Sequence, residues 1–108
     1  MAISRSRVKA PATTKAGEVF AVKTLLRHHM ETGLRIDDRG EVIPRHIINR
    51  FVCRYNEDVV FSVDLHPAVS ANPFLEFYVV ARQSGTLTFA WHEDGGEIYT
   101  AQHQLTVD

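Results

Sequence analysis

Histidine and methionine side chains crowd the stretch HHMETGLR, residues 28–35, and both residue types can bind a transition metal. A zinc or copper centre needs three or four ligands that converge on one point. His28 and His29 are adjacent, and in an extended segment adjacent side chains point to opposite faces. The sequence contains neither His-x-His nor His-Glu-x-x-His. We therefore predict no metal site and interpret the six histidines as scattered surface residues, four of which fall on separate elements: His46, His66, His92 and His103.

We interpret the same stretch as a structural corner of the chain. Gly33 can adopt the positive φ that a tight bend requires. Thr32 or Glu31 can supply a side-chain hydrogen bond to the backbone of the turn. The corner would lead into residues 30–46, a segment too long for an ordinary loop. We predict that this segment is a β-hairpin flap with its tip at residues 37–40, and that Pro44 closes it off.

Cys53 is the single cysteine and the obvious thiol for nucleophilic chemistry. It falls on the predicted inward face of a strand, where burial raises the pKa of a thiol and shields it. No serine lies in a Gly-x-Ser-x-Gly turn, and the six glycines fall at turns or hairpin tips and not in a phosphate loop. We therefore predict no catalytic residue and no cofactor, and we expect that the chain is not an enzyme.

Apolar and polar residues alternate with a period of two through most of the chain, which predicts β-strands. Turn residues separate these segments, most clearly Asp94-Gly95-Gly96. The pattern predicts an all-β fold, an immunoglobulin-like antiparallel β-sandwich, with a small barrel as the alternative. About seven strands are expected, at residues 5–10, 18–26, 47–55, 59–65, 74–83, 86–92 and 97–107.

Two of these strands indicate which side chains face the core. In residues 47–55, Phe51 and Cys53 share one face, while Arg50 and Arg54 place the opposite face in water. The strand at residues 74–83 is apolar on both faces, so its outer face must be covered either by the flap or by another chain. Its two faces carry Leu75, Phe77, Val79 and Ala81 on one side and Phe74, Tyr78 and Val80 on the other.

Length and charge exclude several protein classes. A chain of 108 residues predicts one domain, residues 1–108. The net charge of −1 argues against a nucleic-acid partner, no apolar run approaches the ~20 residues that span a bilayer, and no signal peptide is recognisable. Residues 1–54 contain 11 Lys and Arg against 5 Asp and Glu, whereas residues 55–108 contain 1 against 8. We expect a sandwich to interleave the two halves and average this asymmetry in space.

Four stretches together resemble the Z subunit of the Sox sulfur carrier, SoxZ, from the bacterial thiosulfate-oxidising system. They are HHMETGLR, GEVIPRHIINRF, FSVDLHPAVSANPFLEFYV and GTLTFAWHEDGGEIYT. The likeness extends from about Ala10 to Val107, and its most specific parts are the Met-Glu-Thr-Gly-Leu-Arg and Asp-Leu-His-Pro…Ser-Ala-Asn-Pro runs. His29 departs from the family pattern, which usually has proline at this position.

The resemblance implies an immunoglobulin-like sandwich that forms a heterodimer with the Y subunit of the carrier and meets Sox enzymes transiently. It also implies that the Y subunit holds pathway intermediates covalently on a cysteine of its glycine-rich C-terminal tail. This chain ends in His-Gln-Leu-Thr-Val-Asp, without a terminal cysteine, so the covalent site does not transfer to it. The implied location is the periplasm, reached together with a partner that bears the signal peptide.

We favour the hypothesis that the chain is a non-catalytic scaffold subunit of this carrier. One alternative is sulfur chemistry on Cys53 itself. Another is a metal-dependent redox domain that uses His28, His66 or His92 with Met30. For the partner interface of the favoured hypothesis, apolar patterning selects Met30, Leu34, Ile36 and Ile43 in the flap and Phe74, Tyr78 and Val80 on the sheet.

Overall fold

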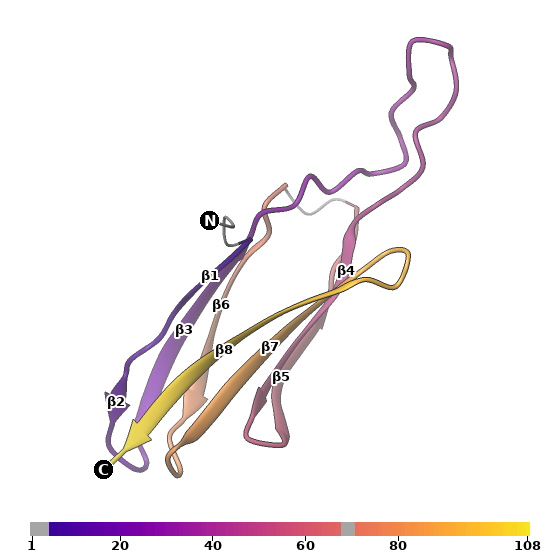
Figure 1. The fold of residues 1–108 in the computed structure, drawn as a ribbon. Helices are drawn as coiled ribbons and strands as arrows, with labels where there is room; N and C mark the ends of the chain where they lie inside the picture. The colour runs from indigo at the N-terminus through magenta and orange to yellow at the C-terminus, as the bar shows by residue number, and fades with distance from the viewer. Residues whose placement is uncertain (1–4, 68–70) are drawn as a thin grey trace, which may run out of the picture.

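The protein is a sandwich of two β-sheets, seen in a computed structural model that describes residues 5–67 and 71–108 (Figure 1). One sheet has three strands in the order β1-β3-β6, and the other has five in the order β2-β8-β7-β4-β5. This architecture confirms the prediction of an all-β sandwich. The strands are β1 (Ser6–Lys9), β2 (Thr13–Thr14), β3 (Val19–Leu26), β4 (Ile48–Tyr55), β5 (Asp58–Asp64), β6 (Phe74–Val80), β7 (Gly85–Glu93) and β8 (Ile98–Val107).

One of the eight strands of the described chain was not expected from the sequence. β2 contains only Thr13 and Thr14, and it pairs in parallel with Thr106 and Val107 at the end of β8. All other strand pairs are antiparallel. A two-residue strand has no measurable alternation, so the period-two pattern could not detect it.

No stretch of the described chain is helical, and hence none forms a helix able to cross a membrane.

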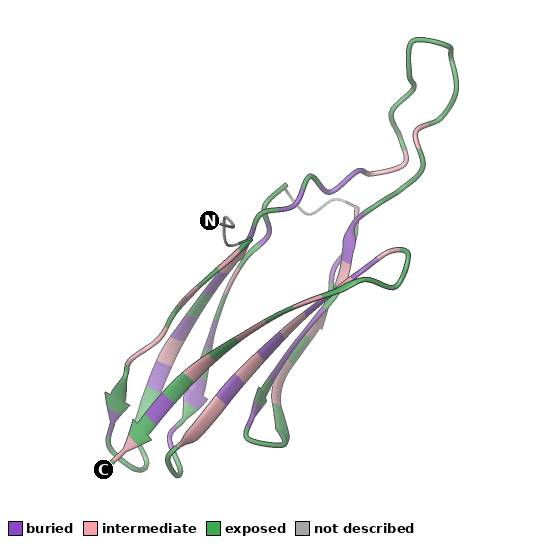
Figure 2. Ribbon diagram, in the orientation of Figure 1, coloured by how far each residue is buried: buried purple, intermediate pink, exposed green. Residues whose placement is uncertain are grey.

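Alternate residues of each strand point into the space between the sheets and form one core, visible as bands of buried and exposed residues in Figure 2. Its centre is aromatic. The ring of Phe51 lies 5.3 Å from that of Trp91 and 5.8 Å from that of Phe77, and Phe61 stacks on Phe77 at 4.3 Å. Because Phe77 belongs to the small sheet and the other three to the large one, these rings hold the sheets together.

The predicted faces of β4 are only partly right. Phe51, Cys53 and Tyr55 are buried as expected, and the two arginines of the other face are exposed. Val52 lies on that second face but is buried as well. Ile48, which alternation also placed there, belongs to the core, next to a register shift between Ile48 and Arg50. β4 lies between β5 and β7, so its neighbours cover short side chains on both faces, and only the long arginines reach water.

Residues 30–46 form the expected flap, which extends beyond the end of the sandwich (Figure 1). Its two arms are bridged at Glu31 with His46 and at Ile36 with Val42. At the predicted tip, the Asp37 carboxylate accepts hydrogen bonds from the amides of residues 39 and 41. Gly33 has a φ of 84°, as predicted for the corner, and an added Cβ there would lie 3.1 Å from the Cβ of Arg45.

Candidate functional site

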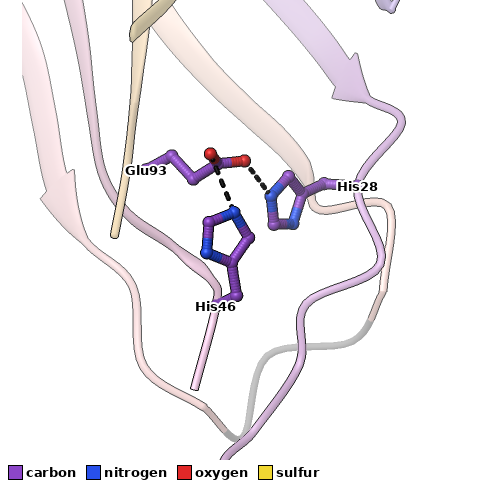
Figure 3. Close-up of side chains that lie close together, drawn as sticks. All are labelled: His28, His46 and Glu93. Atoms are coloured by element: carbon purple, nitrogen blue, oxygen red, sulfur yellow. Dashed lines mark hydrogen bonds and ion pairs between the residues drawn. The ribbon is translucent and has the colours of Figure 1, made fainter. Parts of the chain in front are cut away.

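Three polar side chains from different parts of the sequence meet at the root of the flap: His28, His46 and Glu93, here called the root cluster (Figure 3). Nε2 of His28 lies 2.6 Å from Oε2 of Glu93, and Nε2 of His46 lies 2.9 Å from Oε1. The side chains of His28 and Glu93 are buried, whereas that of His46 is 54% exposed. The cluster lines a pocket of ≈ 300 Å³ together with Arg5, His29, Glu31, Glu97 and Tyr99.

Strand pairing explains why these residues meet. His28 follows the end of β3, and Glu93 is the last residue of β7. Ile48, at the start of β4, pairs with Glu93. His46 precedes β4 by two residues and is tied to the first arm of the flap by two backbone hydrogen bonds with Glu31, of 2.9 and 2.8 Å. The beginning of β4 and the end of β7 therefore carry His46 and Glu93 to the same place.

A backbone amide fixes the tautomer of the buried histidine. The N–H of Met30 donates a hydrogen bond of 3.0 Å to Nδ1 of His28, so this nitrogen must carry a lone pair. The ring proton therefore sits on Nε2, where it is donated to Glu93. Met30 has a φ of 58°, an uncommon conformation for a residue with a side chain. The bend of the backbone thus sets the tautomer of His28.

Glu93 is a buried carboxylate whose oxygens are used by donors. Oε2 accepts the proton of His28 and also the hydroxyl of Tyr99, at 3.0 Å. Burial by itself raises the pKa of Glu93, but the hydrogen bonds from His28 and Tyr99 and the charge of His46 bring this pKa below its ordinary value. Burial and the hydrogen bond to Glu93 raise the pKa of Tyr99. Glu93 is therefore a carboxylate and Tyr99 a neutral phenol at neutral pH.

The donor set of the root cluster could suit a metal ion by residue type, because two histidines and a carboxylate are a common combination. Their ligand atoms lie within 4.8 Å of one another. The hydrogen bonds favour another role. A histidine that binds a metal through Nε2 normally carries its proton on Nδ1, but Nδ1 of His28 faces the Met30 amide. The arrangement is therefore suited to holding the flap, β3 and β7 together by hydrogen bonds.

A second carboxylate holds the other side of the flap root. Asp94 accepts two hydrogen bonds from the guanidinium of Arg45, at 2.8 and 2.9 Å. It also accepts the N–H of Ile47 and the side-chain amide of Asn49. The hydrogen bond with Arg45 is the main reason that the pKa of Asp94 is lowered to about 2, against an opposing effect of burial.

The prediction of scattered surface histidines is wrong for His28, which is buried. The sequence reasoning also missed that His46 and Glu93 meet it. The strand assignment contained only part of the signal: His46 precedes one predicted strand and Glu93 follows another, but it is the structure that makes the two strands neighbours in a sheet. Neither His66 nor His92, which the metal-dependent alternative also considered with Met30, joins His28 in this cluster. Among the described residues, the root cluster is the one group of three histidine, cysteine or acidic ligands at metal-binding distances.

Cys53 lies in the core, as predicted from its position on the strand. Its exposed fraction is 0%, and burial raises the pKa of its thiol to about 12. The thiolate form that attacks an electrophile is therefore scarce at neutral pH. The packing between the sheets also denies a reagent access to the sulfur.

The residues that apolar patterning selected for a partner interface lie on β6, in the flap and, for Met30, in the core. Phe74, Tyr78 and Val80 are exposed on the outer face of β6, with exposed fractions of 57%, 65% and 47%. In the flap, Leu34 and Ile36 are exposed and Ile43 is partly buried.

Met30 differs from the expectation of an exposed apolar residue in the flap. Its side chain is 4% exposed and belongs to the core, and its sulfur accepts the N–H of Ile48 at 3.3 Å. The positive φ turns this side chain inward at the corner. The prediction that Met30 offers an apolar surface to a partner is therefore corrected: it anchors the flap to the sandwich.

Solved structures share this fold. A superoxide reductase (neelaredoxin) from Ignicoccus hospitalis superposes with a TM-score of 0.75 and 18% identity, over 97% of this chain and 81% of that one. The sulfur carrier protein SoxY from Chlorobium limicola f thiosulfatophilum superposes with a TM-score of 0.68 and 16% identity, over 98% of this chain and 81% of that one. At these identities the likeness concerns the fold alone.

The comparison with curated proteins gave no match. The match to a family model is extensive, because residues 8–104 fit the family described as sulphur oxidation protein SoxZ. This range includes every strand from β2 to β7, the flap, the root cluster and most of β8. The chain therefore belongs to the SoxZ family, and its role lies in Sox sulfur oxidation.

Proposed function

We propose that the chain is a non-catalytic scaffold subunit of a heterodimeric sulfur carrier. Its partner, the Y subunit, holds sulfur intermediates on a cysteine of its own C-terminal tail. The observation that carries this proposal is the enclosed state of Cys53 in a member of the SoxZ family. A sulfur intermediate needs a reactive thiolate, and this chain keeps its one thiol protonated and buried.

A division of labour gives the proposal its physical logic. A thiol that visits several enzymes must move, so it is best carried on a flexible, glycine-rich tail. A rigid two-sheet body can anchor such a tail and give the enzymes a constant surface to recognise. The aromatic contacts between the two sheets support this rigid role.

An uncovered apolar surface supports the expectation of a stable partner. Val19 joins the three exposed residues of β6, and all four lie on the small sheet. Single exposed apolar residues are ordinary, but a contiguous group marks an interaction site. Transient contacts with Sox enzymes would use other surfaces of the same heterodimer.

The proposal includes the periplasm as the place of work. In this scheme the Y subunit carries the export signal and this chain crosses with it as a complex. The support is the family resemblance. Fractionation of cells that express a tagged chain with and without the Y subunit tests this point. Periplasmic chain only in the presence of the Y subunit is expected, and export of the chain alone would contradict it.

Co-expression with the candidate Y subunit, followed by gel filtration, tests the heterodimer. We expect one peak that contains both chains in equal amounts at micromolar concentration. A matched control is the Y subunit with its C-terminal cysteine replaced by serine, which should still co-elute because that tail is not the anchor. Two separate monomer peaks would contradict the proposal.

Native alkylation tests the non-catalytic assignment. We expect that iodoacetamide leaves Cys53 unmodified in the folded chain, by intact mass, and modifies it fully in denaturant. The cysteine of the Y subunit in the same sample is the internal control and should react at once. Rapid modification of folded Cys53 would favour sulfur chemistry on this chain instead.

A further inference from the structure

The outer face of the small sheet combines apolar residues with cations. Strand pairing places its outward side chains in rows that cross the sheet. Arg7, Leu25 and Phe74 form the first row, and Lys9, Lys23 and Glu76 form the second. The remaining two rows hold Ala21 with Tyr78 and Val19 with Val80. We call this surface the outer face.

Two hollows flank the lysines of the outer face. One has a volume of ≈ 450 Å³ and a largely apolar wall that includes Val8, Leu25 and Phe74. The other has a volume of ≈ 300 Å³ and is lined partly by Ala10, Pro11 and Ala21. Lys9 and Lys23 line both hollows, and Arg7 lines the larger. Each hollow can receive an apolar side chain while cationic groups stand at its margin.

The cations of the outer face lack an ion pair within the described part of the chain. Arg7, Lys9 and Lys23 have no carboxylate within salt-bridge distance there. Glu76 stands beside Lys23, but it accepts the hydroxyl of Tyr78 at 3.2 Å. Lys9 lies directly opposite Lys23 on the neighbouring strand, and a like-charge pair in that position destabilises a sheet. A partner carboxylate placed between the two lysines would remove this repulsion.

The flap leaves the outer face open. It continues past the end of the sandwich, away from the length of β1, β3 and β6 (Figure 1). The sequence allowed two covers for this face, the flap or another chain. Because the flap leaves it open, another chain remains. A second copy would fit poorly, because a twofold contact brings the same patch against itself. The group of Arg7, Lys9 and Lys23 in one copy would then face the same cationic patch of the other copy.

We infer that the outer face is the docking surface of the Y subunit, which meets it with apolar side chains in the two hollows and carboxylates opposite Arg7, Lys9 and Lys23. This inference rests on the proposed heterodimer and adds the face and the chemistry of the partner. The carboxylates give the pairing its specificity and speed, since complementary charge at an interface acts mainly on recognition and association rate.

Charge reversal tests the inference with the purified Y subunit as the probe. Binding is measured for the native chain and for the double variant Lys9→Glu, Lys23→Glu by titration calorimetry at low and moderate salt. We expect the variant to bind at least about tenfold more weakly. The native complex should also weaken as salt rises, because screening acts on exposed charges.

The matched control is the double variant Arg50→Glu, Arg54→Glu. It makes the same change of charge on two exposed residues of β4, in the other sheet. We expect this control to bind the Y subunit as the native chain does. Equal weakening in both double variants would mean that net charge alone matters, and it would overturn the inference.

Neutralisation gives a readout that mere damage to the fold would not produce. In Lys9→Gln, Lys23→Gln the repulsion between neighbouring strands is gone, so the temperature of unfolding should stay the same or rise. Binding of the Y subunit should nevertheless weaken. A variant that loses stability and binding together would count against a docking role for these lysines.

The possible failures are distinguishable. If the native chain does not bind the Y subunit, both the proposed function and this inference are wrong. If the native chain binds and the Lys9→Glu, Lys23→Glu variant binds equally well, the heterodimer stands and the outer face is not its surface. If the native chain alone forms a dimer that Phe74→Asp dissociates, the occupant is a second copy and the inference is overturned.

Discussion

The root cluster and the outer face differ in how their charged side chains are paired. At the flap root, Glu93 and Asp94 each accept hydrogen bonds from several groups of the same chain. On the outer face, cations and apolar side chains face outward and two lysines oppose each other. The root cluster uses its polar groups in contacts within the fold, whereas the cations of the outer face are available to a partner.

This difference changes which residues we expect to take part in binding. Histidines beside carboxylates suggest chemistry, but here both ring nitrogens of His28 are used in hydrogen bonds within the fold, one with Glu93 and one with the Met30 amide. Lysines and aliphatic residues in an ordinary alternating strand look uninformative in the sequence. Their register and the ion pairs of residues 5–67 and 71–108 show that the lysines have no carboxylate partner within that part of the chain. In this protein the capacity to bind lies where internal contacts are missing.

Loss of Glu93 should have the largest effect on stability. In Glu93→Ala, the buried Nε2–H of His28 keeps no acceptor and the hydroxyl of Tyr99 loses one. We expect the free energy of unfolding to fall by about 3 kcal/mol, since breaking a buried polar pair on one side leaves an unpaired group. Urea unfolding followed by tryptophan fluorescence measures this, because Trp91 is in the core.

The control for that variant is Glu97→Ala, an exposed carboxylate that also contacts Tyr99, at 3.3 Å. We expect less than about 0.5 kcal/mol of change, as for most surface substitutions. If both variants unfold alike, Glu93 is not the centre of the cluster. Where Glu93→Ala remains folded, it should still bind the Y subunit, which separates the root cluster from the outer face.

Truncation of Tyr78 tests the outer face, where binding and not stability should change. Tyr78 is 65% exposed, so Tyr78→Ala should leave the free energy of unfolding nearly unchanged. We expect it to weaken binding of the Y subunit by about 1–2 kcal/mol, since aromatic residues carry much of the energy of an interface. Titration calorimetry measures the affinity. Unchanged affinity would show that a different face meets the partner.

Acidification should lower the free energy of unfolding by protonating Asp94 at the root of the flap. Its pKa in the folded chain is about 2, below the ordinary 3.8, so protons bind more readily to the unfolded chain. The stabilisation is complete above the ordinary pKa and is lost as the pH falls from about 4 towards 2. We expect Asp94 to contribute about 1 kcal/mol at neutral pH, a modest value because Arg45 is half exposed.

Arg45→Ala provides the test of that pH dependence. It removes the main cause of the lowered pKa of Asp94, so unfolding free energies measured by urea between pH 5 and pH 2 should fall less steeply than in the native chain. The matched control is Arg39→Ala at the exposed tip of the flap. An unchanged slope in Arg45→Ala would mean that the amides of Ile47 and Asn49 hold Asp94 by themselves.

The alternation of apolar residues sufficed to predict the sandwich, the inward position of Cys53 and the two-sided β6. It succeeded because a residue on a strand has only two faces to choose between. The flap was also predictable, since turn residues mark its tip. The register was not predictable, and with it the meeting of Lys9 and Lys23, because pairing between β1 and β3 depends on contacts across the sheet.

The root cluster could not be read from local spacing for the same reason. His28 and Glu93 are 65 residues apart, and no short motif joins them. The charge asymmetry of the sequence shows a similar limit. It averages out where Arg50 lies opposite Asp64 on β5, but it persists on the outer face, where β1 and β3 come from the same basic half of the chain.

Substitutions in the flap should have the smallest effects and decide how far the partner surface extends. Leu34 and Ile36 are 84% and 65% exposed, so changing either to serine should alter the free energy of unfolding by less than about 0.5 kcal/mol. We expect each to weaken binding of the Y subunit less than Tyr78→Ala does, because the flap stands apart from the outer face (Figure 1). Titration calorimetry on the three variants, with Val59→Ser on β5 as an exposed control, gives the ranking. A larger loss in Ile36→Ser than in Tyr78→Ala would move the main contact to the flap, and the uncovered sheet would then need a different occupant.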